Sequence, residues 1–147
     1  MRACSRYKKV PTRFASRLHI ALRNRYGDRP TRSAPERTQP YGQRARQSLA
    51  DLAHGRSARA ECPKSDRYGR AVCRVLVDGV DVGLEQVRRG FAWHYVKYAH
   101  EQSPQARLDY AQAEEQARIA RSGLWTVTTP TPPWDYRREQ AARAEGR

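Results

Sequence analysis

Apolar residues recur at helical spacing in three segments of the chain after residue 40. The segments that we predict to be helices are Tyr41–His54, Asp81–Arg89 and Pro104–Ser122. The third helix should begin with Ser103 as its cap and Pro104 at its first position, and Gly123 should end it. The positions at 3.6-residue spacing that should form one of its faces are Leu108, Ala111, Glu115 and Ile119.

Two segments between the first and second helices alternate in the manner of strands. Ser57–Lys64 and Arg70–Val77 flank a polar turn at Ser65–Gly69, which predicts an antiparallel hairpin. Pairing about the centre of the turn sets Cys62 opposite Cys73, Ala60 opposite Val75, and Ala58 opposite Val77. These small and apolar residues form the expected core face, and Glu61 lies opposite Arg74 on the other face.

The two ends of the chain lack this patterning. Residues 1–33 form an atypical basic leader that we interpret as disordered or mistranslated. A Thr/Pro linker at Thr126–Pro133 follows the third helix, and a charged tail at residues 139–147 closes a chain end that should fray beyond Tyr136. The order helix, two strands, helix, helix predicts an α+β fold for one domain at residues 34–138.

The charge of the chain is strongly positive and unevenly placed. Its 147 residues include 29 Lys+Arg and 15 Asp+Glu, a formal net charge of +14. Residues 1–38 alone carry 11 basic and 2 acidic side chains. Such an excess indicates a polyanionic partner, with nucleic acid the first candidate, although a basic leader can also be a solvated arm. No apolar run exceeds three residues, so no membrane span is expected.

A series of short motifs occurs in order from about Ala34 to Arg138. They are Pro35-Glu36, Tyr41-Gly42, DRYGR at Asp66–Arg70, VDG at Val77–Gly79, LEQVRRG at Leu84–Gly90, WHY at Trp93–Tyr95, GLW at Gly123–Trp125 and PPW at Pro132–Trp134. Each motif alone is weak, but DRYGR followed by VDG, the third helix and GLW is specific. Together they strongly resemble the thermonuclease family, the staphylococcal-nuclease-like domains, over roughly seventy percent of the chain.

The resemblance implies an OB-type five-stranded β-barrel with three helices, and an enzyme that cleaves phosphodiester bonds in DNA and RNA with calcium assistance. By motif position, Arg70 would stabilise the negative charge that builds on phosphorus, because a guanidinium can donate two bonds. Glu36 stands where the family has the carboxylate that activates or orients the attacking water.

The resemblance also implies how substrate is held. Arg67 and Tyr68 would bind flanking phosphates. An aromatic run, Trp93, Tyr95 and Tyr98, lies where the family stacks on a base, and Tyr95 is our choice among the three. Read without the family, the same residues are ordinary surface, turn and packing side chains. Trp125 and Trp134 are expected to be structural and to fold the chain end onto the third helix. Glu114 and Glu115 are expected to form a solvated face of the third helix.

The N-terminal half of the family signature is missing. Nothing in residues 1–32 matches the Asp-Gly-Asp-Thr stretch of the family, and Ser33 replaces the aspartate that precedes Ala-Pro-Glu. Asp28 stands where a second catalytic arginine is expected. Glu36, Asp28 and backbone carbonyls are too few oxygen ligands for calcium, so the metal ligands stay unknown. The N-terminal barrel strands are expected to be missing or replaced.

Three explanations of the leader stay open. It is a divergent but functional replacement, or part of a decayed chain that no longer cuts, or a mispredicted or out-of-frame translation joined to a true thermonuclease body. The sequence changes abruptly at Ala34 from an unpatterned, Arg- and Ser-rich stretch to the motifs of the family, which favours the third explanation.

Two of the cysteines indicate in which cellular compartment the protein works. Cys62 and Cys73 are opposed in the predicted hairpin and form either a cross-strand disulfide or two buried thiols. A disulfide would imply an oxidising compartment. The written N-terminus has no secretory signal, so we expect a periplasmic or secreted protein only if the true N-terminus is missing.

We therefore predict a thermonuclease-type endonuclease, monomeric and without a membrane partner, that acts on DNA and RNA through Arg70 and Glu36. The alternative is a catalytically inactive, truncated or frameshifted nucleic-acid-binding module of the same fold, held by charge and stacking. The aspartates that bind the metal in the family are missing, which favours the inactive module for this polypeptide. The remaining motifs favour a nuclease for the family line from which it comes.

Overall fold

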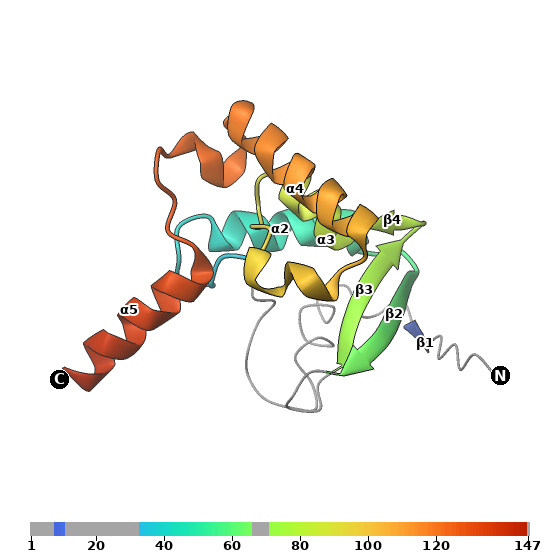
Figure 1. Ribbon diagram of the computed structural model, residues 1–147, viewed down its shortest axis with the longest axis horizontal. Coiled ribbons are helices and arrows are strands. Elements are labelled where there is room, and N and C mark those ends of the chain that lie inside the picture. The colour runs from blue at the N-terminus through green and yellow to red at the C-terminus, as the bar shows by residue number, and fades with distance from the viewer. Residues whose placement is uncertain (1–7, 11–32, 66–70, 147) are drawn as a thin grey trace.

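The computed structural model describes residues 8–10, 33–65 and 71–146, and every structural statement below concerns these residues. Figure 1 shows their elements in chain order, which are β1 (Lys8–Val10), α2 (Gly42–Ala53), β2 (Ala58–Ser65), β3 (Ala71–Val77), β4 (Val80–Asp81), α3 (Val82–Arg88), the 3-10 helix η2 (Val96–Glu101), α4 (Pro104–Ile119), the 3-10 helix η3 (Gly123–Thr126) and α5 (Pro133–Glu145). The α+β class and the three expected helices are confirmed. No helix among the described residues is long and apolar enough to cross a membrane.

The described strands form one open antiparallel sheet in the order β1-β2-β3-β4 rather than a closed five-stranded barrel. The predicted hairpin register is confirmed at the pairs Ala58–Val77, Ala60–Val75 and Glu61–Arg74. The register then shifts between Glu61 and Lys64, where Pro63 has no N–H to donate to the ladder. A strand of the leader, β1, pairs with β2, although the leader has no strand pattern in its sequence.

Two small cores hold the elements together. The first joins α2 to the sheet and consists of Ala53, Val75, Val77 and Val82, with Leu49, Leu52 and Ala58 packed against them. The second joins α3 to α4 and consists of Val87, Ala92 and Ala113, with Leu84 and Tyr110 packed against them. The hairpin face that the sequence assigned to the core therefore meets α2.

The predicted face of α4 is wrong. Leu108 and Ile119 are 57% and 76% exposed, whereas Ala113 and Ala117 are each 2% exposed. The small alanine side chains let α4 lie close against its neighbours, and the bulkier apolar residues face outward. Side-chain size misled the prediction because close helix approach favours small residues at the contact.

The chain end also differs from its prediction. The segment after the Thr/Pro linker is helical from Pro133 to Glu145 and does not fray beyond Tyr136. Figure 1 shows α5 extending away from the other helices, so only its first turns meet the rest of the domain. Pro133 itself is among the most deeply buried side chains.

Two glycines bring the end of α3 against η3. The backbone N–H of Leu124 donates to the carbonyl of Gly90 at 2.8 Å. Gly90 and Gly123 both have positive φ, 72° and 55°. A Cβ on Gly90 would lie 2.2 Å from the carbonyl oxygen of Ser122, and one on Gly123 would lie 2.4 Å from that of Gly90. The two backbones can meet only because neither residue has a side chain.

The carboxylate of Asp81 joins three elements. It caps α3 by accepting from the backbone N–H groups of Gly83 and Leu84 at 2.9 and 3.2 Å. The Nε of Arg74 on β3 donates to it at 2.9 Å, and the hydroxyl of Tyr110 on α4 donates at 3.2 Å. Burial, together with the Asp81 charge, raises the pKa of Tyr110, so this hydroxyl stays a neutral donor.

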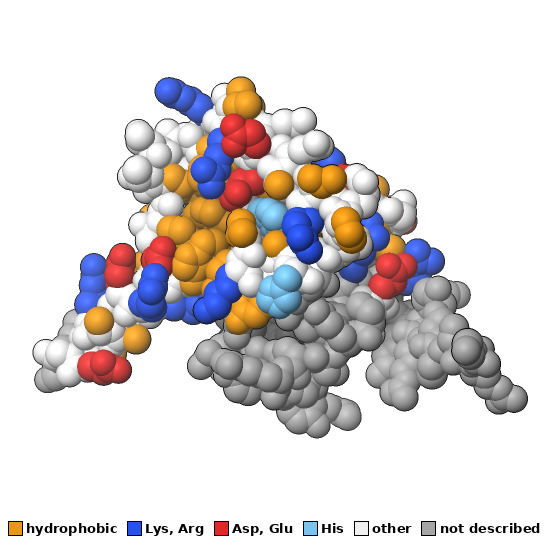
Figure 2. Space-filling view, in the orientation of Figure 1, with side chains coloured by type: hydrophobic (Ala, Val, Ile, Leu, Met, Phe, Trp, Pro, Cys, Tyr) orange, Lys and Arg blue, Asp and Glu red, His pale blue; other side chains and the backbone are white. Residues whose placement is uncertain are grey.

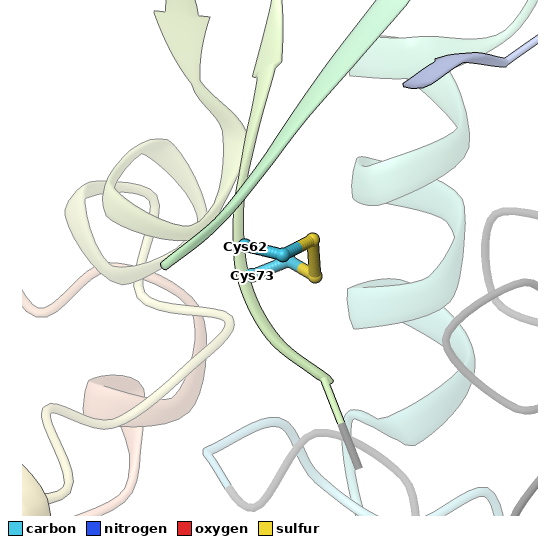
Figure 3. Close-up of a disulfide and its surroundings, with 2 residues drawn as sticks. All are labelled: Cys62 and Cys73. Carbon is cyan, nitrogen blue, oxygen red and sulfur yellow. A yellow bond between two sulfur atoms is a disulfide. The ribbon is translucent and has the colours of Figure 1, made fainter. Parts of the chain in front are cut away.

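Cys62 and Cys73 form a disulfide, which decides between the two alternatives left by the sequence (Figure 3). The bond joins β2 to β3 at the register shift and closes a separation of 11 residues. Cys73 lies two residues from Val75 and so shares the hairpin face that packs on α2.

Replacing Asp81 should destabilise the domain. Asp81→Ala removes the cap of α3 and the shared acceptor of Arg74 and Tyr110, so we expect the free energy of unfolding to fall by about 2–3 kcal/mol. Asp51→Ala, at an exposed position of α2, is the matched control and should cost at most about 0.5 kcal/mol. Urea unfolding followed by circular dichroism measures both values, and equal losses would contradict the role assigned to Asp81.

Thiol counting tests the disulfide. The chain has 3 cysteines, and a bridge uses two of them, so unfolded, unreduced protein should present a single reactive thiol. The same protein after reduction should present all of them and serves as the control. Three reactive thiols without reductant would rule the bridge out.

Candidate functional site

Five residues were predicted to act on substrate, and the structure describes two of them. Glu36 precedes α2 and Tyr95 precedes η2. The other three, Arg67, Tyr68 and Arg70, lie outside the described residues. The geometry below therefore concerns the surroundings of Glu36 and Tyr95.

A tight turn fixes the backbone of Glu36. Its N–H donates to the side-chain oxygen of Gln39 at 3.0 Å, and the N–H of Gln39 donates to the carbonyl of Glu36 at 3.0 Å. The turn lies directly against the first turn of α2, because a Cβ on Gly42 would lie 2.0 Å from the carbonyl oxygen of Glu36. Gly42 therefore allows the close approach, and the Tyr41-Gly42 motif has a structural reason.

The side chain of Glu36 forms an ion pair with α5. The Nη1 of Arg137 lies 2.6 Å from Oε1 of Glu36, and the two side chains are 30% and 19% exposed. Among the described residues, Arg137 is the only donor to this carboxylate. One carboxylate oxygen is therefore anchored, and Oε2 accepts no hydrogen bond from the described part of the chain.

Further polar contacts hold α5 and its approach to the same turn. The hydroxyls of Thr38 and Tyr136 lie 3.1 Å apart. The side-chain amide of Gln39, a residue that is only 6% exposed, donates to the carbonyl of Thr131. The segment that carries Glu36 and the start of α5 are thus joined by several bonds.

Aromatic rings form the other half of the site. Trp93 is 3% exposed and meets Trp125 and Trp134 edge-on, with ring centroids 6.0 and 6.4 Å apart. Tyr95 stacks on Trp134 at 4.3 Å with the planes 17° apart, and Tyr98 lies 5.1 Å from Tyr95. Figure 2 shows hydrophobic side chains gathered on this face between η3, η2 and the start of α5. One face of the Tyr95 ring is therefore covered by Trp134.

The neighbouring helix α4 supports this cluster through charge. The guanidinium of Arg118 lies 4.3 Å from the centroid of the Trp125 ring. Glu114 pairs with Arg118 at 3.5 Å and accepts from the backbone N–H of His94 at 3.3 Å. The structural role expected of Trp125 is confirmed. Glu114 is held in contacts, which corrects its prediction as a solvated residue, while Glu115 is exposed as expected.

The described residues do not fit a calcium site. They contain no group of three or more His, Cys, Asp or Glu that could hold a metal ion. Ser33, at the position of a family aspartate, uses its carbonyl to accept from the N–H of Trp93 at 2.8 Å. Glu36 already has Arg137 as its cationic partner.

Sequence reasoning missed Arg137. The residue lies in a charged stretch that resembles any solvated tail, and its partner is 101 positions away. Positions 137 and 138 are both arginine, so the sequence does not distinguish them. Only the geometry of the helix gives them different partners. Position 138 pairs within α5 with Asp135, whereas position 137 reaches Glu36.

Comparison with known proteins gives consistent matches. A family model described as staphylococcal nuclease homologue matches residues 25–127. A probable staphylococcal-like nuclease of rice, Oryza sativa subsp. japonica, is 34% identical over 139 residues, which cover 91% of this chain and 38% of the rice protein. An uncharacterized endonuclease of Haemophilus influenzae is 34% identical over 107 residues, covering 73% of this chain and 57% of that protein.

A third relative, an uncharacterized endonuclease of Escherichia coli O157:H7, is 35% identical over 105 residues, which cover 71% of this chain and 65% of that protein. The chain thus spans less than two thirds of the length of each of these relatives. The match to the rice protein takes in more of the chain than residues 34–147 contain, so it extends into the leader.

The stack between Trp134 and Tyr95 should stabilise the attachment of α5. Trp134→Ala removes the contacts with Trp93 and Tyr95, and we expect the free energy of unfolding to fall by about 2–3 kcal/mol. The near-UV circular dichroism of the aromatic cluster should weaken as well. Val127→Ala, at a side chain that is 49% exposed, is the control and should change stability by less than about 0.5 kcal/mol. An unchanged near-UV spectrum in Trp134→Ala would contradict the assignment.

Proposed function

Because the chain belongs to the staphylococcal nuclease homologue family, we propose that it is an endonuclease that hydrolyses phosphodiester bonds in DNA and RNA with little sequence preference. The observation that carries this proposal is the environment of Glu36. Its side chain is 19% exposed, and one carboxylate oxygen is held by Arg137. A carboxylate anchored in this way can accept a proton on its other oxygen.

In the proposed reaction, Glu36 orients a water molecule and accepts a proton from it as the water oxygen bonds to phosphorus. Arg70 donates hydrogen bonds to the phosphate oxygens, on which negative charge accumulates. The bond between phosphorus and the leaving oxygen then breaks, and this oxygen takes up a proton from water. Glu36 returns its proton to solvent, so the enzyme is regenerated.

Substrate binding is proposed on the same basis. Arg67 and Tyr68 hold flanking phosphates by charge and by a hydroxyl hydrogen bond. Tyr95 contacts a base through the part of its ring that does not lie on Trp134. Because Trp134 fixes the plane of Tyr95, the ring is oriented before any nucleotide arrives.

Three further properties belong to this proposal. The whole domain forms an OB-type barrel, of which β2 and β3 are two strands. Calcium assistance is proposed on the family resemblance alone, and the bound ion would supply positive charge to the phosphate. The Cys62–Cys73 disulfide supports a protein that works in an oxidising compartment, in the periplasm or outside the cell.

A second candidate function is a nucleic-acid-binding module of the same fold that does not cleave. The observation that favours it is the lack of a carboxylate cluster among the described residues, where the partner of Glu36 is an arginine side chain. Such a module would bind through charge and stacking, so its affinity should fall steeply with salt.

A cleavage assay separates the two functions. The chain should cut single-stranded DNA in the presence of calcium, and Arg70→Ala and Glu36→Gln should each lower the rate by at least about a hundredfold, because each loses a group that acts in the transition state. EDTA tests the metal separately. Cleavage that survives both substitutions and EDTA would exclude the nuclease, and salt-sensitive binding without cleavage would establish the module.

A further inference from the structure

Both described members of the proposed site have their partners on one helix. Arg137 of α5 pairs with Glu36, and Trp134 of α5 stacks on Tyr95. The two partners are three positions apart and so lie on the same face of α5. This helix follows the end of the family match at residue 127, so the match itself does not assign it a role.

We propose that Arg137 is a positioning residue that fixes the Glu36 carboxylate for proton transfer, and the proposal rests on the function proposed above. A glutamate side chain has several rotatable bonds and samples many positions when its carboxylate is unpaired. A charge-assisted bond of 2.6 Å to Oε1 selects one of them. Oε2 accepts no hydrogen bond from the described residues, so we assign the proton transfer to that oxygen.

The burial of the pair makes this contact more effective than an ordinary surface ion pair. Exposed pairs are screened by water and contribute little. The Glu36 side chain is 19% exposed and that of Arg137 is 30% exposed, so both groups are largely removed from solvent. The backbone of Glu36 is held independently by the turn with Gln39. Only the side chain thus depends on Arg137.

The attachment of α5 does not depend on this ion pair. Pro133 is deeply buried, Trp134 packs on Trp93 and Tyr95, and the hydroxyl of Tyr136 contacts Thr38. Removing the Arg137 guanidinium should therefore leave α5 in place. A loss of activity can then be assigned to the carboxylate and not to undocking of the helix.

The neighbouring residue Arg138 provides a matched control. It carries the same charge one position further along α5, its side chain is 79% exposed, and it pairs with Asp135. Arg137→Ala and Arg138→Ala therefore change the net charge equally, but only the first removes the contact with Glu36. Arg137→Lys keeps the charge at the site without the planar guanidinium and should restore part of the activity.

The experiment is a double-mutant cycle on single-stranded DNA cleavage, with thermal unfolding measured for every variant. We expect Arg137→Ala to lower kcat by about ten- to a hundredfold, because a misplaced reacting group costs rate even when substrate still binds. KM should change by less than about threefold, and Arg138→Ala should retain activity within about twofold. In the Glu36→Gln background, Arg137→Ala should have no further effect on kcat.

The possible outcomes separate this inference from the function on which it rests. The positioning role would be overturned if Arg137→Ala lowered kcat equally in the wild-type and Glu36→Gln backgrounds, changed KM alone, or raised kcat. In each of these cases, loss of cleavage in Arg70→Ala would still support the nuclease function. A wild-type chain that cuts nothing, or a Glu36→Gln variant that cuts normally, would instead overturn the proposed use of Glu36 and the positioning role with it.

Discussion

A carboxylate that has been removed from water needs donors around it, and Asp81 obtains them from three elements at once. Two come from the backbone at the start of α3, one from Arg74 on β3 and one from Tyr110 on α4. The relative placement of sheet, short helix and long helix is thereby tied to one side chain. The two cores on either side of α3 are small and rich in alanine and valine. Their packing is not directional, whereas the hydrogen bonds to Asp81 fix the orientation of the three elements relative to one another.

The candidate site lies where this framework meets the chain end. The turn at Glu36, the aromatic run at Tyr95 and the first turns of α5 come from distant parts of the sequence. Their meeting depends on Trp93, which contacts the rings of Trp125 and Trp134 and also bonds through its backbone to Ser33. The Glu36 carboxylate and the Tyr95 ring are therefore both held by α5. Arg137 contacts the carboxylate and Trp134 contacts the ring.

The sequence predicted those elements whose local signals agree with their packing. The hairpin register followed from alternating small and apolar residues, and α4 began at the expected Ser103 because the cap is a local interaction. The buried face of α4 could not be read in the same way, since burial of Ala113 over Leu108 is decided by how closely another helix approaches. The pairing of Arg137 with Glu36 depends on a contact across 101 positions, for which charge composition gives no signal. The residues at 66–70 stay a prediction from motif alone.

The contact between Gly90 and Gly123 limits how this lineage can vary. Each residue faces a backbone carbonyl instead of a side chain, so no substitution of a neighbouring side chain can make room for a Cβ at either position. Gly90 of the LEQVRRG motif and Gly123 of the GLW motif lie 33 positions apart in the sequence, and each is required by the backbone of the other segment. A relative that has lost one glycine should have moved the whole connection between α3 and η3, and the other glycine is then released from its constraint.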